Sequence, residues 1–185
     1  MKVKLKNIAD IQSGFYQKPK DKGDVIYIQA KDFQNNHFTC YNNTHIIASG
    51  KIDKHILNKG DVLLASKGVK TFAWSYKTEI GQAVASSTFF VIRIIDNRIL
   101  PEYLTAILNH RKTIQYFDKL SVGSNIKTIK INVLKNFEVP VIEIREQKKL
   151  INFLSTWEQE KQLTLEIIEK KEKMYQATFF NKLNK

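Results

Sequence analysis

Three polar segments of the chain contain lysines and are suited to contacting nucleic acids; two of them also carry short hydroxyl side chains, and the one at 14–22 carries an aromatic pair. They are Ser66–Thr71, Gly14–Lys22 and Gly123–Thr128. Lysine ammonium groups bind phosphates, while hydroxyl and amide groups also form hydrogen bonds with base edges. The alternative for each segment is an ordinary solvated loop or turn. The candidate contact residues are Lys18, Lys20, Ser66, Lys67, Lys70, Thr71, Ser124, Asn125 and Lys127.

Aromatic residues alternate directly after the first of these segments, at Phe72, Trp74 and Tyr76. A period of two places side chains on the same face of a β-strand. We therefore interpret these rings as the core face of a strand, and stacking on bases is the less favoured alternative.

The sequence lacks the familiar patterns for catalysis, metal binding and cofactor binding. It contains no G-x-x-x-x-G-K-[ST] phosphate loop, no G-x-G-x-x-G turn and no H-E-x-x-H motif. The four histidines are scattered, and Asp61 stands in a turn before an apolar run, which favours a structural role. No acidic pair accompanies a lysine as in a metal-dependent nuclease, and no glycine loop suits S-adenosylmethionine. We predict no catalytic residue, metal or cofactor.

The chain is strongly basic, with 30 Lys and Arg against 18 Asp and Glu and a net charge of +12. Such a field attracts polyanions, nucleic acid first and an anionic membrane second. A generally lysine-rich composition is the competing explanation. The excess is +9 over residues 1–143 and +3 over 144–185, so the first part is the expected polyanion surface.

Apolar runs predict the strands that carry these loops. Short strands are expected at 25–28 and at 62–65, where the run is buried, and the strongest strand region lies at 83–95. Residues 5–12 read as a short helix or a strand entry, and Asn35-Asn36 marks a turn.

Helical and mixed patterns complete the first part of the chain. Pro101 opens a helix expected to reach about Asp118, because apolar residues recur at three- and four-residue spacing. Residues 121–125 form a loop, and the alternation across 129–133 suggests a last strand. The predicted product is a mixed α/β (α+β) domain spanning residues 1–142.

Residues 143–185 predict one long helix, because they contain no Gly or Pro after the strand that ends at Pro140. Such a helix would reach roughly 60 Å at 1.5 Å per residue. A domain of this size is only about 30 Å across, so we expect an intermolecular, coiled-coil-like contact along an apolar stripe. The stripe consists of Leu150, Leu154, Trp157, Leu165, Ile168, Tyr175, Phe179 and Leu183.

A cytoplasmic location is predicted from three features. The single cysteine, Cys40, cannot form an internal disulfide. The N-terminal residues do not form a signal peptide. The most apolar stretch, Val84–Ile95, is interrupted by polar residues and is too short to cross a membrane.

Six stretches and the terminal helix follow one another in an informative order. They are L-K-N-I-A-D-I-Q-S-G-F at 5–15, N-K-G-D-V-L-L-A-S-K-G at 58–68, A-S-S-T-F-F-V-I-R at 85–93, L-P-E-Y-L-T-A-I-L-N at 100–109, the Gly123-Ser124 loop, and F-E-V-P-V-I-E-I-R-E-Q-K-K-L-I at 137–151. Over nearly the whole chain this order resembles the specificity subunits of type I restriction–modification systems. Glu146-Gln147 after the Pro140 strand is the most specific match.

The resemblance implies a DNA target-recognition domain followed by a spacer helix. In that family, each recognition domain reads half of a split DNA target, and the helices act as a ruler and dock the modification (methyltransferase) subunits. The restriction subunit joins the resulting complex. The specificity subunit itself carries no catalytic residues.

This chain departs from the family pattern because it has one recognition domain and one helix where two of each are usual. It is a natural half-subunit, a fragment or the product of a truncated gene. If it is a functional half, two copies would pair their helices antiparallel as a homodimer and read an inverted repeat. The alternatives are a stand-alone sequence-specific DNA-binding protein without methyltransferase partners, and a small nuclease or methyltransferase.

Overall fold

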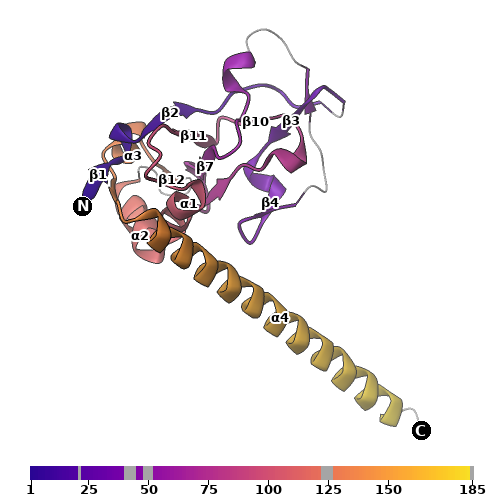
Figure 1. The fold of residues 1–185 in the computed structure, drawn as a ribbon. Helices are drawn as coiled ribbons and strands as arrows, with labels where there is room; N and C mark the ends of the chain where they lie inside the picture. The colour runs from indigo at the N-terminus through magenta and orange to yellow at the C-terminus, as the bar shows by residue number, and fades with distance from the viewer. Residues whose placement is uncertain (21, 40–44, 48–51, 122–126, 184–185) are drawn as a thin grey trace. The chain divides into compact units, whose positions relative to one another are not determined.

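The computed structural model describes all residues except 21, 40–44, 48–51, 122–126 and 184–185. The chain divides into two compact units, the globular unit (Met1–Gln147) and the helical arm (Lys148–Lys185) (Figure 1). The globular unit is a mixed α/β domain, so the fold class predicted from the sequence is confirmed. Helix α4 (Ile144–Leu183) begins next to the expected domain boundary at 142–143; its first four residues belong to the globular unit and the rest form the arm.

The globular unit is built around a four-stranded antiparallel sheet. Its order is β2 (Ala9–Ser13), β11 (Phe89–Ile94), β7 (Val62–Ala65) and β9 (Ala73–Ser75). All four residues of β7 are buried, as its uninterrupted apolar run predicts. The structure therefore confirms the strand expected at 62–65.

A second, three-stranded sheet has the order β10 (Ala83–Ala85), β3 (Val25–Ile28) and β6 (His45–Ile46). Strand β3 runs parallel to β10 and antiparallel to β6, and it confirms the strand expected at 25–28. The two sheets share one buried apolar cluster. Its members are Ile28, Leu57, Leu63, Ala65, Phe72, Tyr76, Ala83, Ala85, Phe89 and Val91.

The strand region expected at 83–95 consists of two strands, β10 and β11, that belong to two different sheets. A turn at Ser86–Thr88 separates β10 from β11, and the hydroxyls of Ser86 and Thr88 lie 2.7 Å apart. The backbone N–H of Ser86 donates to Ile28 O of β3, so the pairing between β10 and β3 extends to the first residue of this turn. Short polar residues in this stretch favour local hydrogen bonds over a strand ladder.

The single helix expected from Pro101 to about Asp118 is corrected to α1 (Pro101–Asn109) and α2 (Arg111–Leu120). His110 interrupts it with an extended backbone, and its Nδ1 accepts a hydrogen bond from Lys112 N at 3.2 Å. This contact caps α2. The proline at the first turn and the buried apolar face of α1 agree with the prediction.

The side chain of Asn109 covers the open edge of β9. Its Oδ1 accepts from Ala73 N, and its Nδ2 donates to Ala73 O, both at 2.8 Å. An edge strand leaves backbone groups unpaired. Asn109 therefore supplies the partner that a further strand would have provided.

The last strand expected across 129–133 is wrong, because α3 (Ile131–Lys135) occupies most of that stretch. Five alternating residues do not distinguish a strand from one helical turn. The strands near it are shorter: β12 (Lys127–Thr128), and β13 (Glu138–Pro140), which pairs with β1 (Lys2–Lys4).

Short elements complete the globular unit. A two-residue turn with positive φ at Asn35 (51°) and Asn36 (65°) joins β4 (Phe33–Gln34) to β5 (His37–Phe38), as the sequence predicts. Strand β8 (Lys67–Gly68) follows β7 closely but pairs with β12 in a separate two-stranded sheet. Residues 5–12 begin as a 3₁₀ turn and continue as β2. The 3₁₀ helices span Leu5–Asn7, Ala30–Asp32, Asp53–His55 and Thr78–Ile80.

The arm is one uninterrupted helix within the described residues, as predicted. The eight side chains of its apolar stripe are each 42–67% exposed. A single helix cannot bury its own stripe, so covering these side chains requires another surface. Among the described residues, no helix is long and apolar enough to cross a membrane.

Candidate nucleic-acid interface

The loops that the sequence singled out lie at one end of the strands of the central sheet. Strands β2 and β7 terminate at this end, while β11 and β9 begin there. The register places Ser13 opposite Phe90, and Ala65 opposite Phe89. Because neighbouring strands are antiparallel, the segments after β2 and β7 emerge side by side. We call this end of the strands the loop edge, and the opposite end the far edge.

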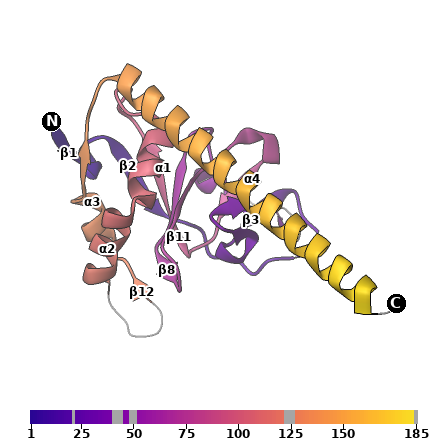
Figure 2. The same cartoon turned by 90° about the horizontal axis from the view of Figure 1, so that it is seen from below.

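The segment that includes 127–128 is also joined to the loop edge. Strands β8 and β12 pair antiparallel, with Lys67 opposite Thr128 and Gly68 opposite Lys127 (Figure 2). The backbone N–H of Ile129 donates to Ser66 O at 2.9 Å. Two predicted segments far apart in the sequence are therefore held together by backbone hydrogen bonds.

The turn at Ser86–Thr88 connects the remaining segment to the same edge. On one side, Phe15 N donates to Ala85 O at 2.8 Å, and Phe15 forms a parallel bridge with Ser86. On the other side, Ser66 N donates to Thr88 O at 2.9 Å. A Cβ on Gly14 would lie 2.1 Å from Ser86 O, so this close approach requires glycine.

Lysines give the loop edge its positive charge. The side chains of Lys18, Lys20, Lys67 and Lys70 are exposed, and Thr71 is half-buried. Exposed ammonium groups on neighbouring loops attract a polyanion without selecting its sequence. These five side chains are accessible to solvent, and Lys20 is paired through its backbone with His45 of β6, in the second sheet.

Ser66 is a correction to the predicted contact residues. Its side chain is 2% exposed, and its hydroxyl donates to Thr88 O at 3.1 Å. The hydroxyl is thus buried and already bonded, so Ser66 anchors the loop and is withdrawn as a contact. Ser124 and Asn125 lie outside the described residues, and Lys127 is placed by its backbone in β12.

The aromatic residues that follow Thr71 belong to the core, as their alternation predicts. Phe72 and Tyr76 are members of the buried cluster shared by the two sheets, and Trp74 packs against it. The ring of Trp74 lies 5.4 Å from that of Phe33, edge to face. These rings are used for packing and are not presented for base stacking.

Two exposed apolar side chains at the loop edge were not among the predicted contact residues. Tyr16 is 82% exposed and Val69 is 86% exposed. Each stands near lysines in a segment that the sequence identified, and that proximity is the available sequence signal. Their exposure depends on tertiary packing, so periodicity does not reveal it.

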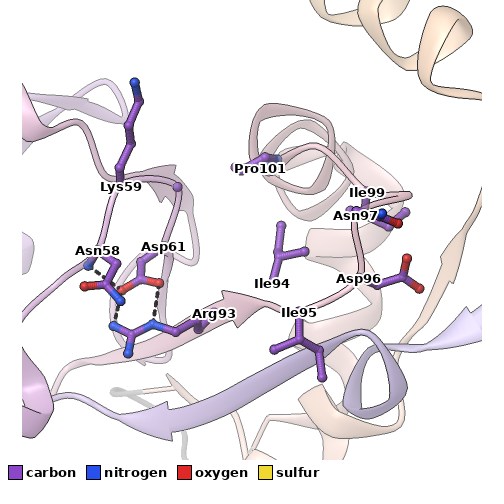
Figure 3. A pocket seen from close by; sticks show the side chains of 11 residues that line it. Asn58, Lys59, Asp61, Arg93, Ile94, Ile95, Asp96, Asn97, Ile99 and Pro101 are labelled. Atoms are coloured by element: carbon purple, nitrogen blue, oxygen red, sulfur yellow. Dashed lines mark hydrogen bonds and ion pairs between the residues drawn. The ribbon is translucent and has the colours of Figure 1, made fainter.

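The far edge of the sheet carries a pocket of about 460 Å³ (Figure 3). Arg93 donates to Asp61 through Nε at 2.9 Å and Nη2 at 2.6 Å, and this hydrogen bonding raises the pKa of Arg93. Asp61 also accepts from Asn58 N at 2.8 Å, which confirms its interpretation as a turn residue. The lining residues are Asn58, Lys59, Gly60, Asp61, Arg93, Ile94, Ile95, Asp96, Asn97, Ile99 and Pro101.

Both carboxylates of this pocket are engaged by arginines. Arg98 donates two hydrogen bonds from Nε and one from Nη2 to Asp96, and this hydrogen bonding lowers the pKa of Asp96 to about 2. Neither acid is therefore placed as a free general base. Among the described residues, no group of three His, Cys, Asp or Glu side chains is arranged to hold a metal ion.

A family model for the type I restriction modification DNA specificity domain matches residues 1–173. The chain belongs to this family. The specificity-domain match includes the whole globular unit and most of the arm.

Two curated specificity subunits are similar in sequence to this specificity-domain chain. The type I restriction enzyme MjaIX specificity subunit of Methanocaldococcus jannaschii is 25% identical over 178 residues, covering 90% of this chain and 40% of that protein. The HindI specificity subunit of Haemophilus influenzae is 22% identical over 159 residues, covering 84% and 35%. The chain thus spans about two fifths of the length of these relatives.

Solved structures share the fold. The S subunit of a type I restriction–modification system from M. genitalium has a TM-score of 0.60 at 17% identity, covering 86% of this chain and 39% of that one. The HsdS subunit from Thermoanaerobacter tengcongensis has a TM-score of 0.61 at 16% identity, covering 86% and 37%. The specificity-domain fold is therefore that of known S subunits, long helix included.

Proposed function

We propose that this chain is the DNA-recognition component of a type I restriction–modification complex and performs none of the catalysis. Its loop edge contacts duplex DNA over one half of a bipartite target. The observation that carries the proposal is the meeting of separate lysine-bearing segments at one sheet edge, in a chain of the specificity-domain family. The complex acts in the cytoplasm, where cellular DNA is accessible to it.

The arm is the proposed docking surface for modification subunits, and the restriction subunit joins through the assembled complex. Support comes from eight apolar side chains on one stripe of a helix that cannot cover them itself. Mixed charges accompany the stripe, including a 2.6 Å pair between Lys173 and Glu169, as expected for a solvated flank. This surface suits association with other helices.

Two copies of the chain, acting together, would pair their arms antiparallel. A two-fold axis then relates two identical loop edges. The proposed target of such a homodimer is an inverted repeat, because each copy reads the same half-site on opposite strands. The distance between the half-sites is set by the paired helices.

A selection experiment tests the proposal. The purified chain, alone and with the type I modification subunit encoded in the same genome, is incubated with a pool of random duplexes, and bound duplexes are sequenced. We expect a defined half-site, and retention of the modification subunit on an immobilised chain. Selection of a sequence without retention would favour a stand-alone DNA-binding protein. Failure to select any sequence in either state would refute the proposal.

A further inference from the structure

The backbone on both sides of Tyr16 is held by one buried hydroxyl. Tyr27, on β3, is 3% exposed. Its hydroxyl donates to Phe15 O at 2.8 Å and accepts from Gln17 N at 3.3 Å. The peptide groups immediately before and after Tyr16 are thereby bonded to the same atom. Burial raises the pKa of Tyr27, so its hydroxyl remains protonated and able to donate at neutral pH.

The residue before Tyr16 is anchored further. The Phe15 ring packs against the buried cluster that contains Tyr27 and Val84, and it lies 4.9 Å from the ring of His55. Phe15 N donates to Ala85 O. Phe15 is partly buried and packed against this cluster, so the backbone next to it presents Tyr16 to solvent. A single exposed apolar side chain is ordinary on a protein surface. Packing does not explain why a buried hydroxyl fixes the backbone on both sides of the exposed Tyr16.

The surroundings of Tyr16 indicate the chemistry of its partner. The same segment supplies the exposed Lys18 and Lys20, and the turn at Ser86–Thr88 connects it to the segment of Lys67. Cations that contact phosphates, next to an aromatic ring with no core role, suit a nucleic acid better than an apolar protein surface. The faces of bases in duplex DNA are covered by stacking, so an exposed ring contacts base edges in a groove, where the thymine methyl is an apolar partner.

We propose that Tyr16 contacts a base of the DNA target through its ring, and that Tyr27 is the positioning residue that holds it there. This inference rests on the proposed function, since it assigns a specificity-determining residue to the same loop edge. Contact between the ring and one base edge gives that position of the target a preference. Lysines at the edge contribute affinity independent of sequence.

Four forms of the full chain test the proposal in the same random-duplex selection: wild type, Tyr16→Phe, Tyr16→Ala and Tyr27→Phe. We expect Tyr16→Phe to keep the wild-type preference, because the ring remains. Tyr16→Ala should lose preference at one or two adjacent positions, with affinity for the selected duplex about tenfold lower. Affinity for an unrelated duplex should not change.

Tyr27→Phe separates positioning from general stability. It retains the ring in the core and removes only the hydroxyl, so preference should weaken about threefold at the same positions. In the double variant, Tyr16→Ala with Tyr27→Phe, preference should equal that of Tyr16→Ala alone, because nothing remains to be positioned. If Tyr27 only stabilised the fold, Tyr27→Phe would weaken the preference by the same factor in the wild-type chain and in the Tyr16→Ala variant.

The controls distinguish failure of this inference from failure of the proposed function. Ile95→Ala removes an exposed apolar side chain from the far edge and should leave the preference unchanged. If wild type selects a sequence and Lys67→Ala weakens all duplexes, but Tyr16→Ala retains the full preference, the inference alone is overturned. If wild type selects no sequence, both are overturned. If Tyr16→Ala keeps the DNA preference but no longer retains the modification subunit, Tyr16 contacts a protein and the inference is also overturned.

Discussion

The buried side chain of Gln147 replaces a backbone partner for Leu100. Its Oε1 accepts from Leu100 N at 2.9 Å, and its Nε2 donates to Arg98 O at 2.6 Å and to Ile142 O at 2.8 Å. Gln147 is 0% exposed and lies in the first turns of α4, within the globular unit. One amide thus satisfies three backbone groups in the segments that precede α1 and α4.

Replacing this amide should destabilise the globular unit. Gln147→Leu fills similar space but leaves a buried donor and two acceptors unpaired, so we expect a loss of about 3 kcal/mol in the free energy of unfolding. Urea unfolding followed by Trp74 fluorescence in a Trp157→Phe background reports on this unit. Gln115→Leu, at an exposed position of α2, is the matched control. Equal stability of the two variants would contradict the assigned role.

The pair between Arg93 and Asp61 should also stabilise the globular unit. Asp61 is 2% exposed, so Arg93→Met leaves a buried carboxylate with its remaining hydrogen bond from Asn58. Since the Arg93 side chain is partly exposed, we expect a loss of about 2 kcal/mol, below that of a fully buried pair. Lys59→Met, in the same pocket and exposed, should leave the unfolding midpoint unchanged. Loss of stability in both variants would argue against a specific pair.

The carboxyl of Asp96 should titrate near pH 2 because Arg98 donates hydrogen bonds to its ionised form. A folded-state pKa below the ordinary value of about 3.9 favours folding above that value and loses this contribution as the pH falls towards 2. Carboxyl chemical shifts followed by NMR across acidic pH measure it. Arg98→Ala should move the midpoint upward, and an unchanged midpoint would exclude Arg98 as the cause.

Lysines at the loop edge should set the salt dependence of DNA binding. Each of Lys67→Ala and Lys70→Ala removes a phosphate contact, so affinity falls alike for all sequences and the slope of log K against log salt flattens by about one unit. Binding of fluorescent duplexes over a salt series measures this slope. Lys59→Ala and Lys77→Ala remove the same charge at the far edge and should retain the wild-type slope. Equal effects at both edges would indicate that net charge alone drives binding.

Adjacent isoleucines of the arm provide a matched pair for testing association. Ile168 is on the apolar stripe, while Ile167 is about 100° away around the helix, and both are exposed. We expect Ile168→Glu to abolish self-association and retention of the modification subunit. Ile167→Glu should retain self-association, because its charge lies off the stripe. Sedimentation velocity on each variant measures the oligomeric state, and a wild-type chain that stays monomeric at micromolar concentration would contradict arm pairing.

Local patterns in the sequence were sufficient for several features of this protein. The four buried residues of β7 and the unbroken α4 were both predicted, because apolar runs and helical periodicity are properties of neighbouring residues. The core position of the Phe72–Tyr76 rings followed from alternation for the same reason. The lysine-bearing segments and their family resemblance were also readable from the chain alone.

Tertiary structure decided what each of those segments does. Sequence reasoning treated Ser66 and Lys67 alike, but the backbone directs one side chain into the core and exposes the other. It did not foresee the division of residues 83–95 between two sheets. It also missed the clamp that Tyr27 places on the backbone around Tyr16. Strand pairing and burial join residues distant in the chain, so no local period encodes them, whereas the polarity and spacing of neighbouring residues are present before folding.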